Sequence, residues 1–71
     1  MDNRIKELRK KECLNQKEFA KAIGVSRQSV SSIENGRYDP SLELAFIISD
    51  LLGKSIEEIF IYERGRKHEK E

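Results

Sequence analysis

A run of hydrogen-bonding side chains lies in the stretch RQSVSSIEN, residues 27–35. If this stretch is a helix, which turns by about 100° per residue, Val30 and Ile33 fall on one side. The opposite side then presents a row of polar side chains: Gln28, Ser31, Ser32 and Asn35, with Arg27 flanking them. In DNA recognition, arginine pairs with guanine, glutamine with adenine, and serine with either kind of base edge. The stretch is therefore predicted to read base edges, with an ordinary solvated polar helix as the alternative.

A second predicted helix lies directly before this one and must hold it in place. Asn15 is expected to cap that helix, and Glu18, three residues later, completes a capping box. Gly24 ends it, and Ser26 then caps the helix with the polar face. Two helices separated by about three residues that include a glycine form a helix-turn-helix. The polar face is thus predicted on the second helix of this motif.

Three further helices are expected to complete an all-α fold of five helices. Asn3 is predicted to cap the first helix. The Asp39-Pro40 pair is predicted to open the fourth helix, which runs to Leu52, because proline suits a first helical turn. A capping box beginning at Ser55 starts a short fifth helix, and the residues after it can extend as a short C-terminal strand.

Length and composition indicate a small single domain of 71 residues. We expect the domain to span residues 1–62 and residues 63–71 to form a charged flexible tail. Such a domain buries only about 60% of its unfolded surface, so self-association would add stability.

Other kinds of chemistry lack the residues they need. The single cysteine, Cys13, excludes a disulfide framework and agrees with a cytoplasmic location. The single histidine, His68, is predicted in the tail, which leaves no catalytic triad and no histidine metal site. No apolar run approaches the roughly 20 residues of a membrane span. We therefore expect no enzyme, metal, cofactor, membrane contact or small-molecule effector.

The net charge of +1 conceals an uneven distribution. Residues 1–37 hold nine basic and five acidic side chains, whereas residues 38–62 hold one basic and five acidic side chains. Residues 63–71 add four basic and three acidic ones. A basic half joined to an acidic half suggests two surfaces with different partners, with double-stranded DNA as the partner of the basic half. A mixed solvated surface is the alternative.

The stretch LNQKEFAKAIGVSRQSVSSIENGRYDPSLELAFIISDLLGKSIEEIF resembles the Cro/phage-repressor type of helix-turn-helix regulator, often called the XRE family. The resemblance runs from about Ile5 to Phe60 and is most specific over residues 14–37. It is closest to the small stand-alone form of the family. It implies a lambda-repressor-like fold of five helices, whose third helix lies in the major groove of DNA.

The resemblance also implies roles for individual residues. Base contacts are implied for three groove-facing residues: Arg27, Gln28 and Ser32. Phosphate contacts are implied for Gln16, Ser29, Asn35 and Arg37, to which the charge of Lys17 is expected to add. Arg9 and Glu34 match a structural ion pair between the first and third helices. The chain departs from the family pattern at Cys13, where glycine is frequent, at the short Ser32, and at Ile47, which replaces a polar residue.

The fourth predicted helix, LELAFIISDLL, is more apolar than one core requires. One stripe matches the inward positions of the family: Leu42, Ala45, Ile48 and Leu52. Six other apolar residues of this region are predicted to form a homodimer interface: Leu44, Ile47, Leu51, Ile56, Ile59 and Ile61. Alternatively, the fifth helix and the tail cover these residues within one chain.

These features together favour a dimeric, sequence-specific DNA-binding transcription regulator. It is expected to act as a repressor at a palindromic operator. The alternative is a protein-interaction module of the same fold, such as an antitoxin.

Overall fold

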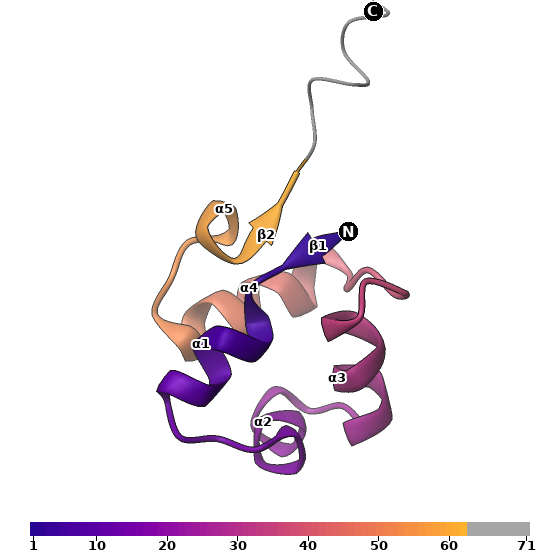
Figure 1. The fold of residues 1–71 in the computed structure, drawn as a ribbon, viewed down its shortest axis with the longest axis vertical. Coiled ribbons are helices and arrows are strands. Elements are labelled where there is room, and N and C mark those ends of the chain that lie inside the picture. Colours follow the sequence, from indigo (N-terminus) through magenta and orange to yellow (C-terminus); the bar gives the residue numbers. More distant parts are fainter. Residues whose placement is uncertain (63–71) are drawn as a thin grey trace, which may run out of the picture.

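The computed structural model describes residues 1–62 and consists of five helices and a two-stranded sheet (Figure 1). The elements follow one another in the order β1 (Asp2–Asn3), α1 (Ile5–Lys11), α2 (Gln16–Ile23), α3 (Arg27–Glu34), α4 (Leu42–Leu52), α5 (Ile56–Ile59) and β2 (Phe60–Ile61). The five predicted helices and the C-terminal strand are confirmed. The predicted tail, residues 63–71, lies outside the described residues.

Side-chain caps start the helices largely where the sequence predicts them. Asn15 Oδ1 accepts from the Glu18 backbone N–H at 2.7 Å, and Glu18 Oε1 accepts from the Asn15 N–H at 2.9 Å. This reciprocal pair is the predicted capping box of α2. Ser55 and Glu58 form the same arrangement at α5, and the Ser26 hydroxyl caps α3. Each cap satisfies a backbone donor that the first helical turn would otherwise leave unpaired.

Two predicted helix starts are wrong in detail. The cap of α4 is Ser41 and not the Asp39-Pro40 pair, because the Ser41 hydroxyl accepts from the Leu44 backbone N–H at 3.1 Å. The N-cap residue of α1 is Arg4, and its side chain makes no capping hydrogen bond. Asn3 instead lies in β1 and accepts from the Ile5 N–H at 3.1 Å.

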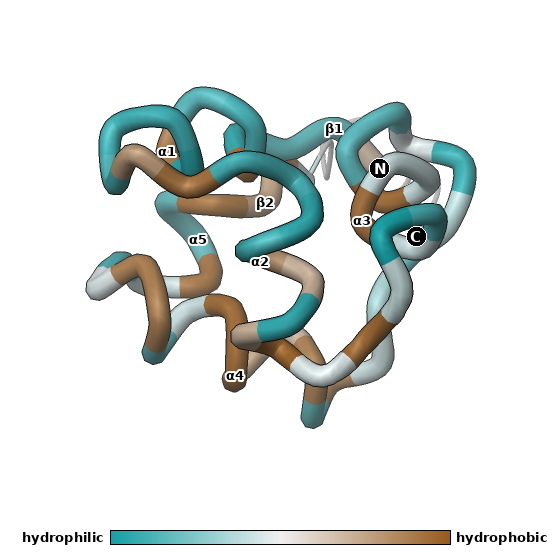
Figure 2. The backbone as a smooth tube through the Cα atoms, turned by 90° about the horizontal axis from the view of Figure 1, so that it is seen from below, coloured by the Kyte–Doolittle hydropathy of each residue, from teal (hydrophilic) through white to brown (hydrophobic). Residues whose placement is uncertain are grey.

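One apolar core joins the helices, and Figure 2 shows hydrophobic residues along most of α4. The buried apolar side chains are Ile5, Leu8, Phe19, Ala20, Ile23, Val30, Ile33, Ala45, Ile48, Leu52, Ile59 and Phe60. They come from every helix and from β2, so the position of α3 depends on packing across the whole described chain.

The two-stranded sheet joins segments from opposite ends of the described chain. β1 and β2 are antiparallel, with Asp2 opposite Ile61 and Asn3 opposite Phe60. The Arg4 backbone N–H extends the pairing by donating to the Ile59 carbonyl at 2.8 Å. The sequence does not predict β1, since aspartate and asparagine are depleted in strands.

Residues with left-handed backbone geometry end α2 and α3. Gly24, at φ +82°, turns the chain from α2 into α3, and Gly36, at φ +75°, follows α3. Cys13 adopts φ +60°, the only positive φ of a non-glycine residue within 1–62. Glycine adopts this conformation without strain, which agrees with the glycine that the family resemblance implies at this position. The Cys13 side chain is exposed and does not pack into the core. Among residues 1–62, no helix combines the length and the apolar character needed to cross a bilayer.

Candidate nucleic-acid interface

The α3 helix presents a polar face to solvent and buries its apolar stripe. Val30 and Ile33 are 1% and 2% exposed, respectively. Arg27 and Gln28 are exposed at the first turn, and Asn35 is exposed at the last. The three serines of the helix, Ser29, Ser31 and Ser32, are half-buried. The structure therefore shows the predicted division of α3 into a buried apolar stripe and a polar face directed to solvent.

The N-terminal turn of α3 combines a capping serine with a free hydroxyl. Ser26 Oγ accepts from the Ser29 backbone N–H at 3.1 Å and donates to Ser29 Oγ at 3.0 Å. The Ser29 hydroxyl therefore keeps its own proton for an external acceptor. The positive end of the helix dipole also lies at this turn. Both features favour an anionic group, such as a phosphate, close to Ser29.

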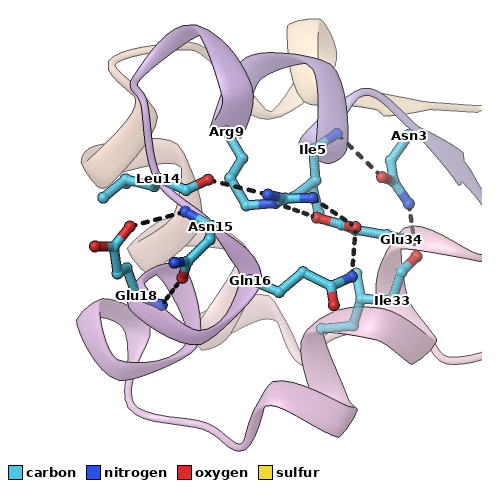
Figure 3. Close-up of polar contacts among 9 residues, drawn as sticks. All are labelled: Asn3, Ile5, Arg9, Leu14, Asn15, Gln16, Glu18, Ile33 and Glu34. Carbon is cyan, nitrogen blue, oxygen red and sulfur yellow. Dashed lines mark hydrogen bonds and ion pairs between the residues drawn. The ribbon is translucent and has the colours of Figure 1, made fainter.

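A buried ion pair fixes the far end of α3 to α1 (Figure 3). Arg9 Nε donates to Glu34 Oε2 at 2.7 Å, and Arg9 Nη2 donates to Glu34 Oε1 at 3.3 Å. Arg9 Nη1 donates to the Leu14 carbonyl at 3.0 Å. The side chains of Arg9 and Glu34 are only 6% and 5% exposed. The structure thus brings together the two residues that the family resemblance pairs, in a bidentate geometry.

Gln16, at the start of α2, belongs to the same network. Its Nε2 donates to Glu34 Oε1 at 3.1 Å, and the side chain is half-buried. Figure 3 shows its amide oxygen directed away from Glu34. A predicted phosphate contact is therefore held in one orientation by a buried carboxylate. The sequence alone does not reveal this bond, because residues 16 and 34 belong to different helices.

The cations near the helix-turn-helix are free to attract a polyanion. Lys17, Arg27 and Arg37 are exposed, and none of them forms an ion pair within the part of the chain that the structure describes. Each can neutralise a phosphate and release a condensed counterion.

Tyr38 is a surface residue next to α3 that the sequence prediction misses. Its side chain is 51% exposed. It borders a shallow depression together with Ser26, the cap of α3, and three polar residues of that helix: Gln28, Ser29 and Ser32. An exposed aromatic residue directly after the Asn35-Gly36 helix stop is the signal that could have found it.

The structure divides the predicted dimer residues into exposed and buried ones. Ile47, Leu51 and Ile61 are exposed, at 40%, 37% and 40%. Ile59 is 0% exposed, so its predicted place in an interface is wrong. Leu44 and Ile56 are half-buried and pack against the core, so only a part of each side chain is accessible to a partner. The division follows from α5, which turns Ile59 into the core.

Two further apolar side chains of α4 lie in solvent. Leu42, predicted to face inward, is 69% exposed, which makes that prediction wrong. Phe46, which the prediction omits, is 58% exposed. Leu42 lies in the first turn of α4 and is turned mostly to solvent, whereas Ala45 and Ile48 are buried. The acidic residues Glu43 and Asp50 border the same open surface as Phe46 and Ile47.

Comparisons with known proteins place this geometry in a family. A family model described as helix-turn-helix matches residues 5–59. The chain is 52% identical over 63 residues to an uncharacterized HTH-type transcriptional regulator of Methanocaldococcus jannaschii, which covers 89% of this chain and 96% of the relative. It is also 52% identical over 44 residues to antitoxin PezA of Streptococcus pneumoniae, covering 62% of this chain and 28% of PezA.

A solved structure shows the same architecture. The restriction-modification controller protein C.AhdI from Aeromonas hydrophila is similar at a TM-score of 0.72 and 30% identity, over 80% of this chain and 86% of that one. The family match covers α1 to α5, which include the polar face of α3 and the ion pair behind it. The family is one of regulators and not of enzymes. The chain belongs to the helix-turn-helix family of DNA-binding transcriptional regulators, of the XRE or Cro/C1 type.

Proposed function

We propose that the chain represses transcription by binding a specific palindromic DNA operator as a homodimer in the cytoplasm. The observation that carries this proposal is the polar face of α3, whose hydrogen-bonding side chains face solvent while Val30 and Ile33 are buried. A helix can enter the major groove of DNA and present such side chains to base edges.

In this proposal the residues of the interface have two kinds of role. Arg27, Gln28 and Ser32 contact bases. Contacts to phosphates come from residues around them: Gln16, Lys17, Ser29, Asn35 and Arg37. Phosphate contacts set the register of the protein on the duplex, and base contacts select the sequence. The bond from Gln16 to Glu34 supports its role, because a fixed amide loses little freedom on binding.

Selection of bound duplexes from a random DNA pool would test the proposal. We expect one enriched sequence with twofold symmetry. Arg27→Ala and Gln28→Ala should each weaken binding to the selected duplex by about 1–3 kcal/mol and weaken binding to random DNA much less. Gln16→Ala serves as the matched control and should weaken both duplexes about equally. An equal loss on both duplexes for all three variants would refute base reading by α3.

The homodimer is supported by the apolar side chains of α4 that lie in solvent. Phe46, Ile47 and Leu51 are too exposed for side chains that serve only the core. A contiguous exposed apolar surface typically marks an interface. Lys54 borders the same surface as Glu43 and Asp50, so a second copy can offer a cation to these carboxylates. A twofold dimer would place two α3 helices about 34 Å apart, one turn of DNA.

Sedimentation of charge variants tests the homodimer. Phe46→Glu and Ile47→Glu should yield folded monomers with reduced operator affinity, because a buried unpaired carboxylate is costly. Lys6→Glu, on the exposed side of α1, is the control and should remain dimeric. A wild-type protein that sediments as a monomer at high micromolar concentration would refute the interface.

A second candidate function is that of an antitoxin-like module, favoured by the similarity to PezA. That similarity covers only 28% of PezA, so it supports this candidate less than it supports DNA binding. Purification with a stoichiometric partner protein, together with failure to enrich any DNA sequence, would favour this second candidate.

A further inference from the structure

The Tyr38 side chain lies at the surface, where a ligand could contact it, and it does not help to hold the described fold together. Its side chain is half exposed, and its hydroxyl makes no hydrogen bond to any residue between 1 and 62. It is absent from the apolar core and from the partly buried side chains around that core. The ring instead borders the depression beside Gln28, Ser29 and Ser32.

The backbone that leads to Tyr38 is tied to α3. The Gly36 N–H donates to the Ile33 carbonyl, and the Arg37 N–H donates to the Ser32 carbonyl, both at 3.0 Å. With Gly36 in the left-handed region, these two bonds form a Schellman motif. Because the chain is ordered up to the residue before Tyr38, binding need not order a loose loop at this point.

The depression is rich in donors and contains no carboxylate. Its lining consists of three serines, Gln28 and Tyr38. The Ser29 hydroxyl proton is free, and Arg37, the neighbour of Tyr38, is an exposed cation. Glu34, the single acid of α3, is occupied by Arg9 and Gln16. Asp39, the residue after Tyr38, pairs with the N-terminal amine at 3.2 Å. Such a surface favours an acceptor with negative charge, and tyrosine hydroxyls are among the groups that donate to DNA phosphates.

We propose that the Tyr38 hydroxyl donates a hydrogen bond to a DNA phosphate next to the bases that Gln28 reads. This inference rests on the proposed interface at α3. Tyr38 then fixes the first two turns of α3 on the duplex, as Gln16 fixes the start of α2. It adds affinity for every sequence and carries no base preference of its own.

Tyr38→Phe is the decisive variant, because it removes the hydroxyl and keeps the ring. Binding is measured by fluorescence anisotropy on the selected duplex and on a scrambled duplex, over a series of salt concentrations. We expect Tyr38→Phe to weaken both duplexes by about ten- to a hundredfold, as for a lost hydrogen bond to a charged group. The salt slope should not change, since a neutral donor releases no counterion. Arg37→Ala, the matched control, removes one cation from each subunit of the proposed dimer and should lower that slope by about 2.

Two results would overturn the proposal. In one, Tyr38→Phe binds like the wild type while Tyr38→Ala loses affinity only for the selected duplex, which would mean that the ring reads a base. In the other, both variants bind like the wild type, which would mean that Tyr38 is not a contact. Gln28→Ala is measured in parallel. If it too leaves both affinities unchanged, the α3 interface fails; if it weakens the selected duplex, only the inference on Tyr38 fails. Thermal unfolding of each variant shows that the fold is retained.

Discussion

Removal of Glu34 is expected to cost a large part of the stability of this protein. The Glu34 carboxylate accepts two hydrogen bonds from Arg9 and one from Gln16. Glu34→Ala leaves the Arg9 guanidinium buried, with only its bond to the Leu14 carbonyl. Hydrogen bonds to charged groups are worth about 1.5–3 kcal/mol each, so the loss of two from Arg9 costs about 3–6 kcal/mol. This agrees with about 3–5 kcal/mol for breaking a buried pair.

The scale of this loss follows from the size of the chain. At about 0.05–0.15 kcal/mol per residue, a chain of 71 residues has a free energy of unfolding of about 4–11 kcal/mol. Glu34→Ala should therefore be strongly destabilised or unfolded. Urea denaturation followed by circular dichroism measures this. Added salt should leave the cost nearly unchanged, because buried pairs are screened much less than exposed ones.

A double variant separates charge burial from packing. Arg9→Met combined with Glu34→Leu removes both charges and keeps apolar volume, so it should recover much of the stability lost by Glu34→Ala. A cost below about 1 kcal/mol for Glu34→Ala would refute the reasoning, since only an exposed pair is worth so little. A double variant as unstable as Glu34→Ala would show that lost packing, and not an unpaired charge, causes the effect.

Three further predictions concern the stability of the fold. In urea denaturation, Cys13→Gly should be about 0.5–1 kcal/mol more stable than Cys13→Ala. Glycine relieves the strain of the left-handed backbone, and this gain exceeds the cost of the extra entropy that glycine gives the unfolded chain. Equal denaturation midpoints for the two variants would contradict this. The hydrogen bonds from Ser55 lower the pKa of Glu58 from its usual 4.5, so the capping box contributes stability above that pH and loses it as the pH falls. Wild-type stability should therefore fall more steeply than that of Glu58→Gln in acid, and parallel profiles would exclude a role for this charge. Asn3→Ala removes a bond of 2.8 Å to the Ile33 carbonyl and the bond from the Ile5 N–H. It should lower the free energy of unfolding by about 1–2 kcal/mol and so lower the melting temperature, whereas an unchanged melting temperature would mean that water replaces both bonds.

The helices could be predicted because their start signals are local. A cap such as Ser26, or the box of Asn15 and Glu18, involves residues within one turn of each other, and the sequence displays that spacing directly. The polar face of α3 follows from the same local periodicity. The strand β1 could not be predicted, since Asp2 and Asn3 extend only because β2 lies beside them.

Burial on α4 and α5 depends on tertiary packing, which periodicity alone does not supply. Ile59 and Leu42 are both apolar residues near helix ends, yet one is fully buried and the other is mostly exposed. The Arg9–Glu34 pair joins residues 25 positions apart, and only the family resemblance suggested it. Tyr38 was missed because its place beside Gln28 results from the turn at Gly36.

The pairing of β1 with β2 has a consequence for the order of folding. Asp2 and Ile61 lie near the two ends of the described chain, so their contact closes a loop that includes all five helices. Closing a long loop costs entropy before its contacts form, whereas α2 and α3 meet across a three-residue connection. We therefore expect the sheet to form last and to open first, with the amide of Arg4 exchanging hydrogen sooner than that of Val30. The helix-turn-helix formed by α2 and α3 would then outlast the sheet during unfolding.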